Sequence, residues 1–112
     1  MDNKKRVLEL VRCWNYCDFA AVKKIVDKGY IAYALYSGKK VSGIKGVIRN
    51  IKDSHKSFKG LKVVVEDIIS EKNKVACRIT LKSGKKRKKE LIIFRLKGGK
   101  IKEAYSIGSA WQ

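Results

Sequence analysis

The stretch that decides the fold is Ile92-Ile93-Phe94-Arg95-Leu96-Lys97-Gly98-Gly99-Lys100-Ile101-Lys102-Glu103. Two partly apolar runs flank a Gly-Gly pair, and such a pair between two strand-like runs is a strong signal for a tight hairpin turn. We therefore expect one strand over residues 89–97 and another over residues 100–112. Strands joined by so short a turn must be antiparallel neighbours.

The alternation of apolar and polar residues continues upstream of this hairpin. It predicts strands over residues 61–70 and 74–82, joined by a turn at residues 71–73 and followed by a basic connection over residues 83–87. The aromatic-rich segment 30–36 is predicted as a strand or an extended segment. The sequence therefore predicts a curved antiparallel sheet built on four successive strands.

The region before residue 61 also has helical periodicity, and it predicts three helices. The first begins at Asp2 or Asn3, the second is capped by Asp18 and ends near Gly29, and the third is capped by Ser42 and ends at residue 60. The apolar stripe of the third helix is the clearest of the three. Its members are Ile44, Val47, Ile48, Ile51, His55 and Phe58. Helices packed on one face of a sheet make an α+β architecture.

The composition is that of a globular, strongly basic protein. The chain has 112 residues, 45% of them hydrophobic, and we read residues 1–112 as one domain. Lys and Arg number 28 against 10 Asp and Glu, a net charge of +18. The odd set of three cysteines does not suit a disulfide framework, and no apolar signal segment or membrane span is apparent. These features predict a reduced, cytoplasmic protein.

Four local motifs, in this order, resemble the SnoaL-like polyketide cyclases of the nuclear-transport-factor-2-like superfamily. The motifs are Trp14-Asn15-x-x-Asp18, Tyr30-Ile31, Gly43-x-x-Gly46, and Ile92-Ile93-Phe94-Arg95 through Gly99-Lys100-Ile101-x-Glu103. The resemblance implies a cone-shaped domain with a cavity between helices and sheet. It also implies homodimers formed through the sheet. The superfamily hosts many activities, so a function does not follow from the fold.

The chain departs from the family pattern where relatives keep acid and base groups. Tyr33 stands where many relatives have His, Tyr105 replaces a Trp, and Ser109 replaces the Asp that serves cyclases. A cyclase must move a proton at a carbon centre, and a serine hydroxyl does not titrate near neutral pH. Whether the protein is an enzyme is therefore left open by the sequence.

Six residues are candidates for lining the cavity or binding a ligand there. They are Trp14, Tyr33, His55, Cys77, Glu103 and Tyr105. Of these, His55 and Glu103 could act as acid or base, or could make structural hydrogen bonds and ion pairs instead. The cysteines lack metal-site spacing, so we expect no metal ion and no cofactor.

A cationic run over residues 82–89 is the candidate site for a polyanion. Its cations are Lys82, Lys85, Lys86, Arg87, Lys88 and Lys89. On a hairpin it could contact phosphates, or it could be a solvated loop that discourages edge-to-edge strand pairing.

Three functions remain open at this point. The first is a pocket for a small apolar or aromatic molecule, without the usual cyclase acid and base. The second is a basic module that binds nucleic acid or an acidic protein. The third is a diverged cyclase or isomerase that uses Glu103 or His55.

Overall fold

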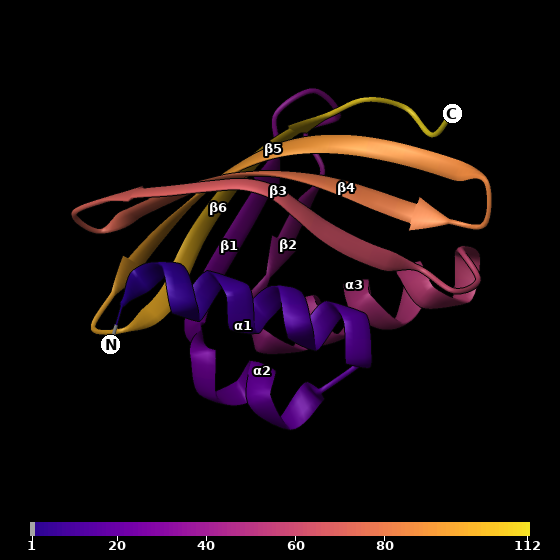
Figure 1. The fold of residues 1–112 in the computed structure, drawn as a ribbon. Coiled ribbons are helices and arrows are strands. Elements are labelled where there is room, and N and C mark those ends of the chain that lie inside the picture. The colour runs from indigo at the N-terminus through magenta and orange to yellow at the C-terminus, as the bar shows by residue number, and fades with distance from the viewer. Residues whose placement is uncertain (1) are drawn as a thin grey trace.

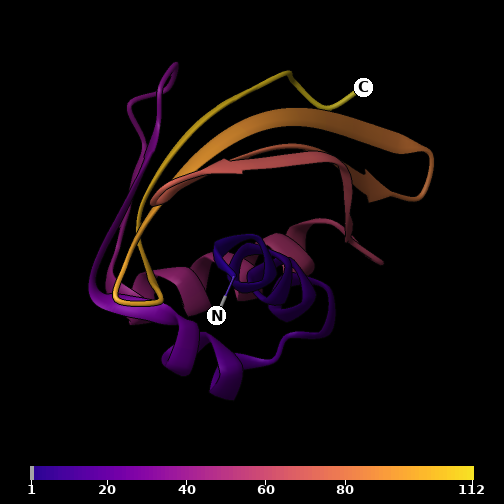
Figure 2. The same ribbon diagram turned by 60° about the vertical axis from the view of Figure 1, so that its left-hand side comes forward.

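A computed structural model describes residues 2–112 as three helices packed on one face of a six-stranded sheet (Figure 1). The elements are α1 (Asn3–Tyr16), α2 (Phe19–Ile25), β1 (Val26–Ala34), β2 (Lys40–Ser42), α3 (Gly43–Ser57), β3 (Lys62–Glu71), β4 (Lys74–Ser83), β5 (Lys86–Lys97) and β6 (Lys100–Gly108). The predicted α+β class, with the helices first, is confirmed. Figure 2 shows the sheet curving around the helical layer.

The strand order is β2-β1-β6-β5-β4-β3. β3, β4, β5 and β6 form the predicted antiparallel meander, but β1 lies parallel to β6, so the sheet is not antiparallel throughout. β2 was not predicted, because a strand of three residues is too short to show an alternation of apolar and polar side chains.

The boundary between α2 and β1 differs from the prediction. The helix ends at Ile25 rather than near Gly29, because Val26 already pairs with Ile101 of β6. Gly29 instead lies where the register between β1 and β6 shifts, and its N–H donates to a carboxylate oxygen of Asp27 at 2.7 Å. A glycine read as a helix stop is in fact part of a strand irregularity.

The β4–β5 hairpin is tighter than the predicted basic connection. β4 reaches Ser83 and β5 begins at Lys86, so only Gly84 and Lys85 form the turn, and Gly84 has a φ of +57°. Most of the cationic run therefore lies on strands. At the other end, β6 stops at Gly108 rather than at residue 112, although Gln112 still exchanges two backbone hydrogen bonds with Arg87.

The motif at residues 14–18 joins three elements. Asp18 caps α2 by accepting from the N–H of Ala21 at 3.1 Å. Asn15 docks α1 onto β3, because its amide donates to the carbonyl of Val63 and accepts from the N–H of the same residue, at 3.0 and 2.7 Å. Short polar contacts thus fix the end of α1 against the sheet.

The hydrophobic core lies between the helices and the concave face of the sheet, called here the inner face. It includes Val7 of α1, Val22 of α2, Ile51 of α3, Phe94 of β5 and Ile101 of β6, all buried. The opposite face of the sheet is called the outer face. In the part of the chain that the structure describes, no helix has the length and apolar character needed to cross a membrane.

Candidate functional site

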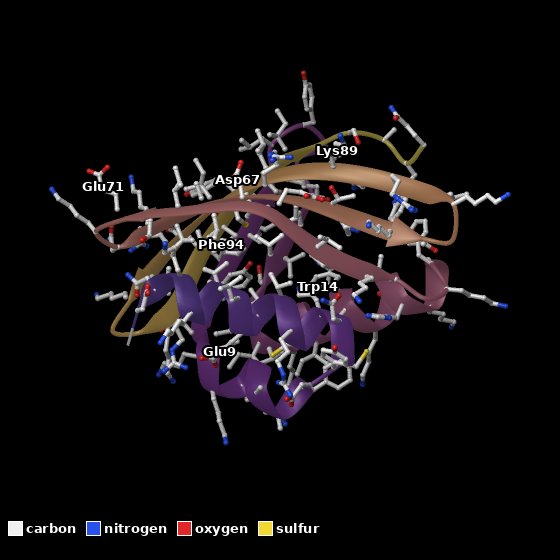
Figure 3. The ribbon with its side chains drawn as sticks, viewed as in Figure 1. Glu9, Trp14, Asp67, Glu71, Lys89 and Phe94 are labelled. Atoms are coloured by element: carbon white, nitrogen blue, oxygen red, sulfur yellow. The ribbon has the colours of Figure 1, made fainter. Side chains whose placement is uncertain are left out.

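A cavity of about 400 Å³ lies between the inner face of the sheet, α1 and α3. Most of its lining is aliphatic or aromatic. The lining residues are Leu10, Val11, Trp14, Tyr30, Ala32, Tyr33, Ala34, Ser37, Lys39, Val41, Asn50, Ser54, Phe58, Leu61, Val63, Cys77, Ile79, Leu81, Lys88, Glu90, Ile92, Phe94, Ala104, Ser106 and Trp111. Figure 3 shows Trp14 and Phe94 in the space between sheet and helices. The volume suits a small organic molecule.

Two stacked aromatic rings form part of the cavity lining. Trp111, in the segment after β6, stacks on Phe58 at the end of α3, with ring centroids 4.3 Å apart and planes 20° apart. The tail is fixed beside β5, because the N–H of Ser109 donates to the carbonyl of Lys89 at 2.9 Å. The cavity therefore has an aromatic wall made from two distant parts of the chain.

One charged pair enters the cavity from β5. The Lys88 ammonium lies 3.3 Å from a carboxylate oxygen of Glu90, and both side chains are partly buried. They share the inner face with Ile92 and Phe94, because alternate residues of a strand point to the same side. Glu90 was not among the residues predicted for the site, although it lies two steps of two residues before Phe94 and therefore shares its face.

The thiol of Cys77 faces the same cavity. Burial raises the pKa of Cys77 to about 11, and the nearby Glu90 carboxylate adds to the shift. Cys77 is thus an uncharged, weakly polar wall residue at neutral pH. Burial also raises the pKa of the Tyr30 hydroxyl well above its usual range.

Trp14, Tyr33 and Cys77 are the predicted site residues that border the cavity; His55, Glu103 and Tyr105 are absent from its lining. Tyr33 pairs with Tyr105 in register, and the two rings stack with centroids 5.4 Å apart. Because Ala104 and Ser106 line the cavity, Tyr105 points to the outer face. The Tyr33 ring, stacked on Tyr105, therefore lies on the outer face too.

Glu103 also lies on the outer face of the sheet. Its carboxylate accepts a hydrogen bond of 2.8 Å from Nε of Arg95, its neighbour across β5 and β6. This hydrogen bond lowers the pKa of Glu103, so the residue is held as a carboxylate. Its partner is an arginine rather than a ligand in the cavity.

His55 and Ser109 have structural partners. Nε2 of His55 donates to the carbonyl oxygen of Trp14 at 2.6 Å, which ties the end of α3 to the end of α1. The hydroxyl of Ser109, where relatives keep an Asp, accepts from the N–H of Lys89 at 3.1 Å and donates to the carbonyl of Ala110 at 2.9 Å. Neither side chain lines the cavity.

The strand pleat divides the cationic run. Lys88 lines the cavity, whereas Lys82 and Arg87 are directly opposite each other on neighbouring strands and both point outward from the outer face. Lys89 projects outward as well (Figure 3). Six neighbouring cations in the sequence are thus not one cluster in space. Across residues 2–112, no three His, Cys, Asp or Glu side chains gather in a way that could hold a metal ion.

The model of the SnoaL-like polyketide cyclase family matches residues 5–108. The chain belongs to this family. Among curated proteins, none matches the sequence significantly. The SnoaL-like match covers all six strands and every cavity-lining residue except Trp111.

Solved structures with the same fold have little sequence in common with this SnoaL-like chain. A proposed ketosteroid isomerase from Kribbella flavida has a TM-score of 0.86 at 8% identity, covering 96% of this chain and 78% of that chain. IdmH from Streptomyces antibioticus, a proposed polyketide cyclase, has a TM-score of 0.85 at 14% identity, covering 97% and 93%. A nuclear-transport-factor-2-like protein of unknown function from Cytophaga hutchinsonii has a TM-score of 0.77 at 20% identity, covering 97% and 91%. These similarities establish the fold alone.

Proposed function

We propose that this SnoaL-like domain binds a small, mainly apolar, ring-containing molecule in the cavity. The observation that carries the proposal is an apolar cavity of about 400 Å³ with one charged pair, Lys88 and Glu90, on its wall. Ligand pockets usually combine an apolar lining with a few placed polar groups that orient the ligand. The stacked rings of Phe58 and Trp111 provide a flat surface for an aromatic ligand.

Intrinsic tryptophan fluorescence tests this proposal directly. The chain has two tryptophans, Trp14 and Trp111, and both line the cavity. Titration with a panel of neutral and singly charged polycyclic aromatics should quench or shift this emission in a saturable way. The absence of saturable binding across the panel would contradict the proposal.

A cavity-filling variant shows whether such binding occurs in the cavity. Ala32→Phe adds a ring to the lining and should abolish saturable binding. Ala20→Phe on the exposed side of α2 makes the same chemical change outside the cavity and should leave binding intact. Binding that survives Ala32→Phe would place the ligand elsewhere.

A second candidate function is proton transfer by Glu90. Glu90 is the one carboxylate among the cavity-lining residues, and a positioned carboxylate is a common general base. It would take a proton from a carbon next to a carbonyl and return it to another carbon of the same ligand. This assignment replaces Glu103 and His55, whose hydrogen bonds hold them outside the lining.

The isomerisation of a β,γ-unsaturated ketosteroid to its conjugated enone is a suitable assay, since one structural relative is a proposed ketosteroid isomerase. The enone is followed by its ultraviolet absorbance. Glu90→Gln should abolish turnover while aromatic ligands still bind, and Glu103→Gln should retain turnover. Turnover that survives Glu90→Gln would exclude Glu90 as the base.

We also propose that two copies pair through the outer face. Leu91 pairs with Ile107 and Ile93 with Tyr105, and these four exposed side chains form the outer apolar patch. Two cations of this face are paired within the chain: Arg95 with Glu103, and Arg78 with Asp67 at 3.2 Å. The outer apolar patch can therefore meet the same patch of a second copy, although the whole chain carries +18.

Sedimentation analysis tests the pairing. Ile93→Arg places a charge in the middle of the outer apolar patch and should convert a dimer to a monomer. Leu8→Arg, at an exposed position of α1, is the matched control. A wild-type protein that is monomeric at micromolar concentration would refute the pairing.

The three free thiols, Cys13, Cys17 and Cys77, support the proposal of a reducing, cytoplasmic location.

A further inference from the structure

Three cations stand abreast on adjacent strands at one end of the outer face. Lys62 of β3 is directly opposite Lys82 of β4, and Lys82 is directly opposite Arg87 of β5. Their strand neighbours Val63, Leu81 and Lys88 line the cavity, so the three cations point to the outer face. Lys62, Lys82 and Arg87 are called the basic row.

The basic row is an unfavourable arrangement for the isolated protein. Like charges directly opposite each other on neighbouring strands destabilise a sheet. Acidic side chains compensate cations elsewhere on this face, as Glu103 does for Arg95 and Asp67 for Arg78. Within residues 2–112, none of the three members of the row forms an ion pair. An external anion would relieve this repulsion.

Hydrogen bonds hold Arg87 of the row in place and bring Lys59 close to the hairpin that carries it. Nη1 of Arg87 donates to the carbonyls of Gly84 and Lys86 at 2.8 and 2.9 Å, which leaves Nε and Nη2 available. The hydroxyl of Ser83 donates to the carbonyl of Lys59 at 2.8 Å, so the loop after α3 lies against the β4–β5 hairpin. A guanidinium fixed in this way suits a phosphate oxygen.

We propose that the basic row, flanked by Lys59 and Lys85, binds the phosphate backbone of a nucleic acid duplex without reading its sequence. The cations would neutralise phosphates on adjacent nucleotides, as in other backbone contacts. This surface lies on the opposite side of the sheet from the cavity. The inference is therefore independent of the proposed small-molecule function.

The side chains around the row favour a duplex over other polyanions. Single-strand binding usually needs exposed aromatics on which bases stack, and surface helices that enter a membrane present exposed apolar side chains. The large exposed hydrophobic side chains of the described chain are Leu8, Tyr16, Leu35, Tyr36, Ile69, Leu91, Ile93, Tyr105 and Ile107. None of them belongs to segments 59–62 or 82–87. The phosphates of a duplex, by contrast, can be bound by cationic side chains without aromatic or apolar contacts.

Fluorescence anisotropy with a labelled 20-base-pair DNA duplex, measured from low to moderate KCl concentration, tests the proposal. The test variant is the triple substitution Lys62→Gln, Lys82→Gln and Arg87→Gln. It should weaken binding at least about tenfold near 0.1 M salt and reduce the slope of log affinity against log salt by about 2 to 3. Its thermal melting point should be unchanged or higher, because a repulsive row has been removed.

The matched control is the triple substitution Lys5→Gln, Lys97→Gln and Lys100→Gln, which removes the same charge from exposed positions outside the row. It should leave the salt slope within about 1 of the wild-type value. Equal weakening by both variants would show that only bulk charge acts, and would overturn the proposal. So would the absence of binding at low salt, or row-dependent binding that is tighter to a single strand or to phosphatidylserine vesicles than to the duplex.

Discussion

The two faces of β5 carry different kinds of function on one strand. Lys88, Glu90, Ile92 and Phe94 point into the cavity. Arg87, Leu91 and Ile93 point outward; Arg87 belongs to the basic row, and Leu91 and Ile93 belong to the outer apolar patch. The inner face holds its one charged pair inside an apolar cavity, whereas the outer face keeps its charges near solvent. A strand of twelve residues can therefore serve a ligand site and two surfaces at once.

The largest difference between the faces should appear in folding stability. Phe94→Ala removes a buried ring from the inner face and should lower the free energy of unfolding by about 3 kcal/mol or more. Ile93→Ala truncates a neighbour that is 50% exposed and should cost less than about 1 kcal/mol. Urea denaturation at low protein concentration measures both. Equal losses would mean that the outer face is covered in the folded monomer.

Much of this comparison could be predicted from the sequence, because alternation along β4 and β5 fixes which residues share a face. The hairpin at Gly98-Gly99, the helix cap at Asp18 and the inward direction of Cys77 follow from local chemistry. The parallel pairing of β1 with β6 joins residues about seventy positions apart, and no local signal specifies it.

The candidate site was harder to predict than the fold. Glu103 and Tyr105 belong to the family motif, but β6 turns them to the outer face. Glu90 stands next to a run of cations and looks in the sequence like one more surface charge. It lies inside the predicted strand over residues 89–97, however, and the alternation that turns Phe94 inward turns Glu90 inward as well.

A smaller contrast concerns the cysteines. Cys17 is exposed at the end of α1, whereas Cys77 is buried against the cavity with a pKa raised to about 11. At pH 8 the thiolate fraction of Cys77, and with it alkylation by iodoacetamide, should be on the order of a hundredfold below that of a free thiol. Mass spectrometry of peptides from a labelling time course should show Cys17 modified first. Rapid labelling of Cys77 would mean that the cavity opens widely to solvent.

The smallest expected effect concerns the outer-face ion pair and its dependence on pH. The hydrogen bond from Arg95 lowers the pKa of Glu103 in the folded protein, so the unfolded chain binds a proton at this position more readily. The stabilisation is therefore fully present above the ordinary pKa of a glutamate, and it is lost as the pH falls through the lowered value. Glu103→Gln should remove this part of the acid sensitivity and leave the unfolding free energy less dependent on pH in the acidic range. Urea denaturation at several pH values measures it, with Glu71→Gln at an exposed hairpin end as the matched control. If both variants gave the same pH profile, the Arg95–Glu103 pair would contribute nothing to the pH dependence of folding stability.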